Sequence, residues 1–206
     1  MATHPPLQSA LQAAVDDGTF PGAVLAVRLR GGLVFEGAAG LLTPKVPGEV
    51  VTVETCYDLA SLTKVLATTT ALVLLAQRGL LKLDDRIEGI LNELRDRPIG
   101  AATVRHLLTH SSGLPGWRPY YERIAARDAA QPGCLGGVAT RAAVLDYIAA
   151  EELVYERGTR SLYSDLGFML LGQVVERLSG ESLDEFCRGQ IFTPLGASPL
   201  AYLPHG

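Results

Sequence analysis

Apolar residues recur at helical spacing near the start of the chain. Leu7, Leu11, Ala14 and Val15 would share one face of a helix, and Gly18 follows as a residue that can end it. The pattern therefore predicts an amphipathic helix at the start of this sequence, with its apolar face available to pack on whatever element comes next.

Two short apolar runs follow, over residues 23–29 and 33–38, and Arg30-Gly31-Gly32 separates them. Because adjacent glycines supply the positive φ angles that tight hairpin turns need, the pattern predicts an antiparallel β-hairpin. Residues 50–53 are expected to add one more short strand. Few strand candidates follow residue 53, and a two-stranded hairpin is marginally stable alone, so the expected sheet is incomplete in this chain.

The spacing of apolar residues becomes helical from Ser61 onward. A helix is expected over 62–77 and is ended by Gly79, and shorter helices are expected after Asp84 and after the cap Thr103. The second part of the chain is therefore expected to be mainly helical.

Further helices are expected over 140–151, over 165–178 and after the capping box Ser182-Leu183-Asp184-Glu185. Residues 111–137 interrupt this pattern with glycines, prolines and aromatic residues. We expect this segment to form a long excursion on the surface with a short helix around residues 121–130, and long loops of this kind are often functional.

The composition is that of an ordinary globular protein. The 206 residues are 48% hydrophobic and 19% charged, with a formal net charge of −4. A nucleic-acid partner, which would need clustered lysine and arginine, is therefore not expected. The three cysteines, Cys56, Cys134 and Cys187, are scattered and have no histidine at ligand spacing, so neither a metal site nor a disulfide framework is expected.

The first residues lack the basic and apolar regions of a signal peptide. The most apolar run, 65–76, is expected to be too short to span a bilayer, and threonines interrupt it. We therefore expect a cytoplasmic protein with no membrane partner. A periplasmic or secreted location stays open if a leader was removed.

Candidate chemistry begins with Ser61-Leu62-Thr63-Lys64. Residues three apart on a helix share a face, so the hydroxyl of Ser61 and the amine of Lys64 can touch. A serine needs a base to become a nucleophile, and both a helix start and burial disfavour a charged lysine, so a neutral Lys64 is the expected base. In the alternative interpretation, Ser61 is a helix N-cap and Lys64 reaches into water.

A second candidate is Tyr163-Ser164-Asp165, which lies on a loop directly before an expected helix. Beside a lysine, the pKa of Tyr163 would fall, and its phenol could then move protons. In the alternative interpretation, Asp165 is the N-cap of the helix and Tyr163 is a half-buried packing residue.

Five segments that occur in one order carry a resemblance: LASLTK (59–64), VRHLLTHSSGLP (104–115), YSDLGFMLLG (163–172), ERLSG (176–180) and IFTPLG (191–196). Together they resemble the serine β-lactamase-related superfamily, and most of all its branch of class C β-lactamases, D-aminopeptidases and family VIII esterases. The resemblance implies an α/β (α+β) architecture, which is a β-lactamase-like fold with a helical subdomain and an antiparallel sheet.

The resemblance also implies catalytic and substrate-binding roles for individual residues. Ser61 matches the acylated nucleophile, Lys64 its general-base partner, and Tyr163 the tyrosine that helps to activate the serine and protonates the leaving group. Asp165 stands in a substrate-binding place where the lactamase form has asparagine, and an ionised aspartate only accepts hydrogen bonds. This departure favours a small ester or an amide such as a D-amino-acid peptide over a β-lactam. No metal or organic cofactor is implied.

Aromatic residues and histidines supply further candidates. Trp117 and Tyr120 could line a substrate cleft with Tyr121, or all three could pack within the loop. His106 and His110 are four apart, as in some metal sites, but no acidic third ligand is placed nearby, so we expect both to be structural.

The family carries a third motif, of Lys-Thr-Gly or His-x-Gly type, on a strand that supplies an oxyanion-hole N–H, and no such motif follows Tyr163. We expect residues 1–206 to form a single β-lactamase-like unit that lacks its C-terminal strands and helix, with the first helix and hairpin in 1–58 and a mainly helical part in 59–206. A fragment of a longer serine hydrolase is favoured. The alternatives are completion by a second chain or within a homo-oligomer, and a non-catalytic relative that binds a peptide-like ligand.

Overall fold

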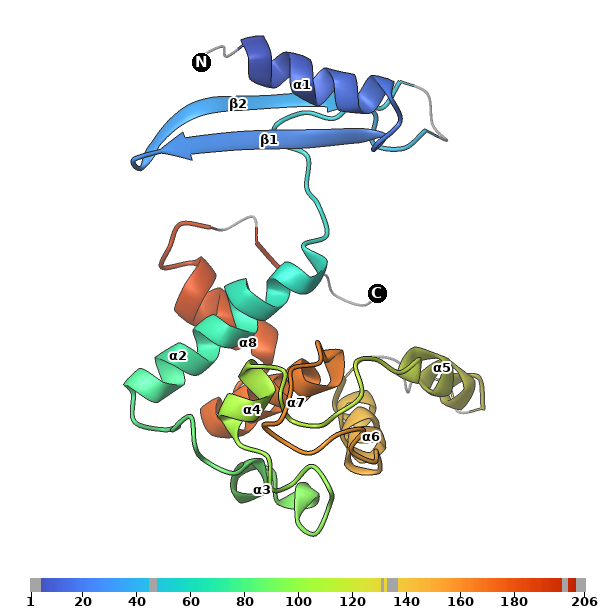
Figure 1. Ribbon diagram of the computed structural model, residues 1–206, viewed down its shortest axis with the longest axis vertical. Helices are drawn as coiled ribbons and strands as arrows, with labels where there is room; N and C mark the ends of the chain where they lie inside the picture. Colours follow the sequence, from blue (N-terminus) through green and yellow to red (C-terminus); the bar gives the residue numbers. More distant parts are fainter. Residues whose placement is uncertain (1–4, 45–47, 131, 133–136, 198–199, 203–206) are drawn as a thin grey trace. The chain divides into compact units, whose positions relative to one another are not determined.

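The computed structural model describes residues 5–44, 48–130, 132, 137–197 and 200–202. The chain divides into two compact units, residues 1–59 and 60–206 (Figure 1). This division falls beside the boundary that was expected between the helix-and-hairpin part and the mainly helical part. Cys134 lies outside the described residues.

The first unit is a helix packed on a β-hairpin. Helix α1 (Pro5–Asp16) lies along strand β2 (Gly32–Gly40), which pairs antiparallel with strand β1 (Gly22–Leu29) (Figure 1). The two turn residues, Arg30 and Gly31, have positive φ angles of 51° and 83°. A type I′ turn requires such angles at both positions, so the predicted hairpin is confirmed with Gly32 inside β2.

The strand expected over residues 50–53 does not form. Val50 makes only an isolated bridge with Leu41, and the sheet has two strands among the described residues. A turn in which the N–H of Thr55 donates to the carbonyl of Thr52 (3.0 Å) bends the chain away directly after this bridge, so pairing cannot continue.

The second unit consists of short helical segments around the long helix α7 (Asp165–Ser179). The remaining segments are, in chain order, η1 (Ala60–Leu62), η2 (Lys64–Thr69), α2 (Thr70–Gln77), α3 (Ile87–Ile90), η3 (Asn92–Leu94), α4 (Val104–Leu108), α5 (Tyr120–Ala130), α6 (Gly137–Ala149), α8 (Leu183–Cys187) and η4 (Arg188–Phe192).

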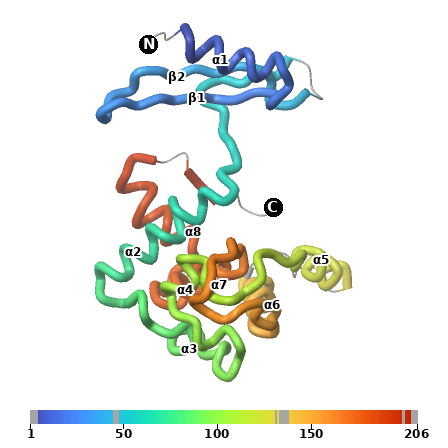
Figure 2. Tube along the Cα trace, in the orientation of Figure 1, coloured from blue at the N-terminus to red at the C-terminus, as the bar shows by residue number. Residues whose placement is uncertain are grey.

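Helix α7 is the centre of the hydrophobic core of this unit. Segments α2, α4, α6 and α8 all pack against it (Figure 2). Its fully buried side chains recur at helical spacing and are Leu166, Leu170, Leu171, Val174 and Val175. Burial of one such side chain stabilises the fold by about 1.5–3 kcal/mol, so the start of α7 is firmly held.

The N-cap of α7 is Ser164 and not Asp165. The Oγ of Ser164 accepts a hydrogen bond from the N–H of Gly167 (3.2 Å) and donates one to the carbonyl of Pro115 (2.8 Å). Because Ser164 satisfies this first-turn N–H group, the carboxylate of Asp165 is available to another partner. At the other end Gly180, with a φ of 75°, closes the helix as predicted.

The helix expected over 62–77 is a continuous but irregular stretch that begins at Ala60. It passes from a 3₁₀ turn through the π-helical turn η2 into α2. These 18 residues, Ala60–Gln77, are long and apolar enough to cross a membrane by length and composition. The apolar run 65–76 lies inside this longer stretch, and core helices of soluble proteins pass the same test.

Candidate active site

Ser61 lies in the exposed turn η1, directly after a strained residue. Ala60 has a positive φ of 44°, a backbone conformation that costs a residue with a side chain about 1–3 kcal/mol. The turn places the Oγ of Ser61 3.3 Å from the Nζ of Lys64. The hydroxyl of Ser61 contacts the side chains of Lys64 and Tyr163, which differs from the alternative interpretation of Ser61 as a helix N-cap.

Lys64 is largely buried and forms an ion pair with Asp165. Its side chain is 15% exposed, and its Nζ lies 2.6 Å from the Oδ1 of Asp165. Desolvation lowers the pKa of Lys64, but hydrogen bonds and charge from Asp165 and Tyr163 outweigh it, so the pKa of Lys64 is raised above its ordinary value. The expectation of a neutral Lys64 is therefore wrong, because a partner from α7 holds the proton on the amine.

Tyr163 completes a cluster with these residues. Hydrogen bonds with Ser61 and Lys64 lower the pKa of its phenol, and the positive charge of Lys64 adds to this effect. The Nζ of Lys64 also lies 5.0 Å from the centre of the Tyr163 ring. Because Tyr163 hydrogen-bonds to Ser61 and loses its own proton at a lower pH than Lys64 does, its phenolate is more available than a neutral amine to accept the serine proton.

Asp165 is held by the loop that carries the aromatic candidates. Its backbone N–H donates to the carbonyl of Gly116 (2.8 Å), and its carboxylate faces Lys64. A side chain at Gly116 would meet the carbonyl of Tyr163 at 2.9 Å, so this close approach depends on glycine. The loop after Pro115 thus runs directly beside the segment that bears Tyr163 and Asp165.

The aromatic residues of this loop have different environments. Trp117 and Tyr121 are 55% and 65% exposed, and their ring centres are 6.4 Å apart. Tyr120 is only 4% exposed, and its hydroxyl donates to Glu151 (2.8 Å). Burial raises the pKa of Tyr120, and the bond to Glu151 adds to this effect. Of the two alternatives left open for these residues, the burial of Tyr120 therefore supports packing, whereas Trp117 and Tyr121 are exposed together.

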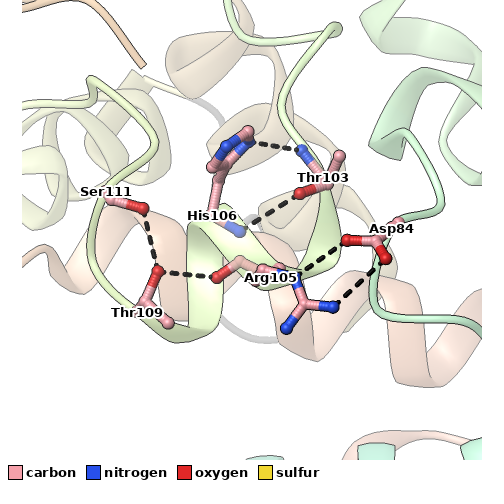
Figure 3. Close-up of polar contacts among 6 residues, drawn as sticks. All are labelled: Asp84, Thr103, Arg105, His106, Thr109 and Ser111. Atoms are coloured by element: carbon pink, nitrogen blue, oxygen red, sulfur yellow. Dashed lines mark hydrogen bonds and ion pairs between the residues drawn. The ribbon is translucent and has the colours of Figure 1, made fainter. Parts of the chain in front are cut away.

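His106 supports the turn beside the site and does not enter it. The backbone N–H of Thr103 donates to the Nδ1 of His106 (3.2 Å), and the N–H of His106 donates to the Oγ1 of Thr103 (3.3 Å) (Figure 3). On the same helix, Arg105 contacts both carboxylate oxygens of Asp84 (Figure 3). Within the described part of the chain, no three His, Cys, Asp or Glu residues are placed to hold a metal ion.

His110 was expected to be structural, but it lies against the candidate active site. Its ring centre is 4.5 Å from that of Tyr163 and 5.1 Å from that of Phe168. No pattern in the sequence indicates this placement. His110 and Ser164, whose backbone it contacts, are 54 residues apart, so no local spacing could have indicated that they meet.

The Beta-lactamase family model matches residues 7–202, and the chain belongs to this family. The N-acetylmuramyl-L-alanine amidase of Bacillus subtilis (strain 168) is 32% identical over 198 residues, which cover 90% of this chain and 43% of the amidase. The resemblance to the serine β-lactamase-related superfamily is thereby confirmed.

Solved structures of other proteins share the fold. The octameric penicillin-binding protein homologue from Pyrococcus abyssi has 30% identity and a TM-score of 0.75, covering 93% of this chain and 42% of that one. EstCE1, described as a hydrolase with promiscuous acyltransferase activity, has 27% identity and a TM-score of 0.75. The match covers 92% of this chain and 50% of EstCE1. The expected β-lactamase-like fold is confirmed, and the chain spans 42–50% of the length of these three proteins.

Proposed function

We propose that this chain carries the acylating residues of a serine hydrolase that works through an acyl-serine intermediate. The observation that supports this most directly is the meeting of Ser61, Lys64 and Tyr163. Lys64 donates to the Oγ of Ser61 across 3.3 Å, and the phenol of Tyr163 hydrogen-bonds with both residues. A serine within reach of a proton acceptor, which a third group in turn orients, is the arrangement that nucleophilic catalysis needs.

In the proposed acylation step, the phenolate form of Tyr163 takes the proton of Ser61 while Oγ attacks the carbonyl carbon. Lys64 stays protonated, and its ammonium stabilises the phenolate on which the step depends. Tyr163 then gives its proton to the departing alcohol or amine, and the acyl group remains on Ser61. In the second step, water loses a proton to Tyr163 as it attacks the acyl group, and Tyr163 returns this proton to the Oγ of Ser61 as the acid leaves.

The proposed substrates are small esters or amides, including D-amino-acid peptides. The carboxylate of Asp165 only accepts hydrogen bonds and is already paired with Lys64, whereas an asparagine would also donate one. A β-lactam that needs a side-chain donor at this position would bind less well. The names of an amidase and of a hydrolase with acyltransferase activity among the similar proteins support the amide and ester classes.

The share of each relative's length that this chain matches supports a second candidate function. Because the chain spans 42–50% of the proteins that it matches, it can also be a catalytically incomplete relative or fragment that binds a peptide-like ligand. In this case catalysis would need a complementing chain or a homo-oligomer, and the Pyrococcus abyssi relative is named as an octamer.

Intact mass after exposure to a fluorophosphonate probe tests the proposal. A single adduct is expected on the wild-type chain and none on Ser61→Ala. Ser9→Ala, which changes an exposed serine of α1, is the matched control and should label like the wild type. An adduct that persists in Ser61→Ala would remove Ser61 as the nucleophile. A folded wild-type chain that takes no adduct would favour the second candidate function.

A further inference from the structure

His110 holds the backbone on both sides of Tyr163. Its carbonyl accepts the N–H of Leu162 (2.8 Å), and its Nδ1 accepts the N–H of Ser164 (3.1 Å). Between these two bonds, the ring of Tyr163 lies against the imidazole, with ring centres 4.5 Å apart and planes tilted by 34°. One residue therefore contacts the tyrosine and the residues before and after it.

His110 is itself fixed in an uncommon conformation. Its φ of 56° is in the left-handed region, which a residue with a side chain keeps only where its surroundings enforce it. Its N–H donates to the carbonyl of Leu107 (3.1 Å), and its carbonyl also accepts the hydroxyl of Tyr155 (2.9 Å). Phe168 of α7 provides a second ring contact, with centres 5.1 Å apart. The imidazole is thus a rigid support.

The imidazole can act in this way only when it is neutral. An N–H group donates to Nδ1 only if that nitrogen carries no proton, so protonation there would break the bond from Ser164. The charged groups around His110 are Lys64 of η2 and Asp165 of α7, and the titratable hydroxyls of Tyr155 and Tyr163 face it from the neighbouring loop. Desolvation and the charge of Lys64 lower the pKa of His110, and Asp165 opposes this effect.

We propose that neutral His110 is a positioning residue for Tyr163, which keeps the phenol directed at Ser61 and Lys64 by holding residues 162 and 164 and by supporting the ring. This inference rests on the proposed function and goes beyond it. Protonation of His110 at Nδ1 releases the backbone of Ser164 and places a second cation near Lys64, so acidification slows acylation beyond the loss that protonation of the Tyr163 phenolate itself causes.

Two variants separate positioning from general stability. His110→Asn keeps an acceptor near the position of Nδ1 but does not titrate, and His110→Ala removes acceptor and ring. His106→Asn and His106→Ala are matched controls, because the Nδ1 of His106 also accepts a backbone N–H but lies outside the site. Each variant is compared by its rate of fluorophosphonate labelling across pH and by the ultraviolet titration of the Tyr163 phenol, with Tyr163→Phe as the reference.

His110→Ala is expected to slow labelling about 10- to 100-fold, since small displacements of a catalytic group cost rates of this size. The phenol pKa of Tyr163 should return toward its ordinary value in the same variant. His110→Asn should restore part of the rate, and its rate relative to the wild type should rise as the pH falls through the pKa of His110. The His106 variants should label like the wild type.

Wild-type labelling and an unchanged phenol pKa in both His110 variants would overturn the proposal. Equal losses in the His106 variants would do so too, because they would mark a general scaffold effect. If the wild-type chain takes no label at all, the proposed function fails. The phenol titration, which needs no activity, then still decides the role of His110, and His110→Asn serves this purpose if His110→Ala does not fold.

Discussion

Lys64 and Asp165 are 101 residues apart in the chain, and the Nζ of Lys64 lies 2.6 Å from the Oδ1 of Asp165. Lys64 opens the π-helical turn η2, and Asp165 is the first residue of α7, so the packing of these two elements creates the pair. The pair favours the charged amine and occupies the side chain that replaces the asparagine of the lactamase form. In the proposed mechanism, proton transfer from Ser61 is therefore left to Tyr163.

Asp165→Asn is expected to change both the charge on Lys64 and the choice of substrate. The pKa of Lys64 should fall, because a neutral amide no longer stabilises the ammonium. Acylation by a penicillin should rise relative to acylation by a small ester, by about tenfold at most, since one hydrogen bond contributes about 0.5–1.5 kcal/mol. The measurement is intact mass after competition between the two reagents.

Asp84→Asn is the control for this variant, because Asp84 pairs with Arg105 away from the site. An unchanged ratio of penicillin to ester acylation in Asp165→Asn would show that residue 165 does not discriminate between these substrates.

Lys64→Met is expected to slow the labelling of Ser61 about 100-fold or more. This is the lower end of the rate loss that follows when assistance to proton transfer is removed. The phenol pKa of Tyr163 should rise toward its ordinary value, because Lys64 contributes a hydrogen bond and charge that lower it. A time course of adduct mass and an ultraviolet titration measure the two effects. Lys82→Met, at an exposed lysine, is the control. Normal labelling in Lys64→Met would mean that activation of the serine does not depend on this amine.

Tyr120→Phe should change the stability of the fold but not the labelling rate, whereas Trp117→Ala should change substrate affinity but not stability. Tyr120→Phe removes the hydrogen bond to Glu151 and is expected to lower the free energy of unfolding by about 1 kcal/mol, with no change in labelling rate. Trp117→Ala removes a side chain that is 55% exposed, so stability should change little while apparent substrate affinity falls. Denaturant unfolding and substrate titration distinguish them, and the reverse pattern would assign Tyr120 to substrate binding.

The Lys64–Asp165 pair also predicts a dependence of stability on pH. The pKa of Lys64 is higher in the folded chain than its ordinary value of 10.5. Its contribution to stability is therefore complete below pH 10.5 and is lost as the pH rises through the folded-state pKa. The difference in unfolding free energy between the wild type and Asp165→Asn should shrink in that alkaline range. A difference that stays constant there would show that the pair does not stabilise the fold.

Several elements could be predicted from the sequence because they depend on neighbouring residues alone. The hairpin was predicted from Gly31 and Gly32, although its turn has the positive φ angles at Arg30 and Gly31, and the capping box of Ser182 and Glu185 opens α8 as expected. The strand over 50–53 was wrong, because a turn that bends the chain after a single bridge outweighs a short apolar run. Local strand propensity is a weak guide here, because a strand forms only where a neighbouring strand can pair with it.

The sequence by itself also determined the contact between Ser61 and Lys64, since a spacing of three on a helix brings both side chains to one face. Only the tertiary structure decided that Lys64 stays charged, that Tyr120 is buried, and that His110 supports Tyr163. Each of these outcomes depends on a partner far away in the chain. Charge and hydrogen bonding act over a few ångströms, so the packing of η2, α4 and the 111–118 loop around the start of α7 sets the properties of the site.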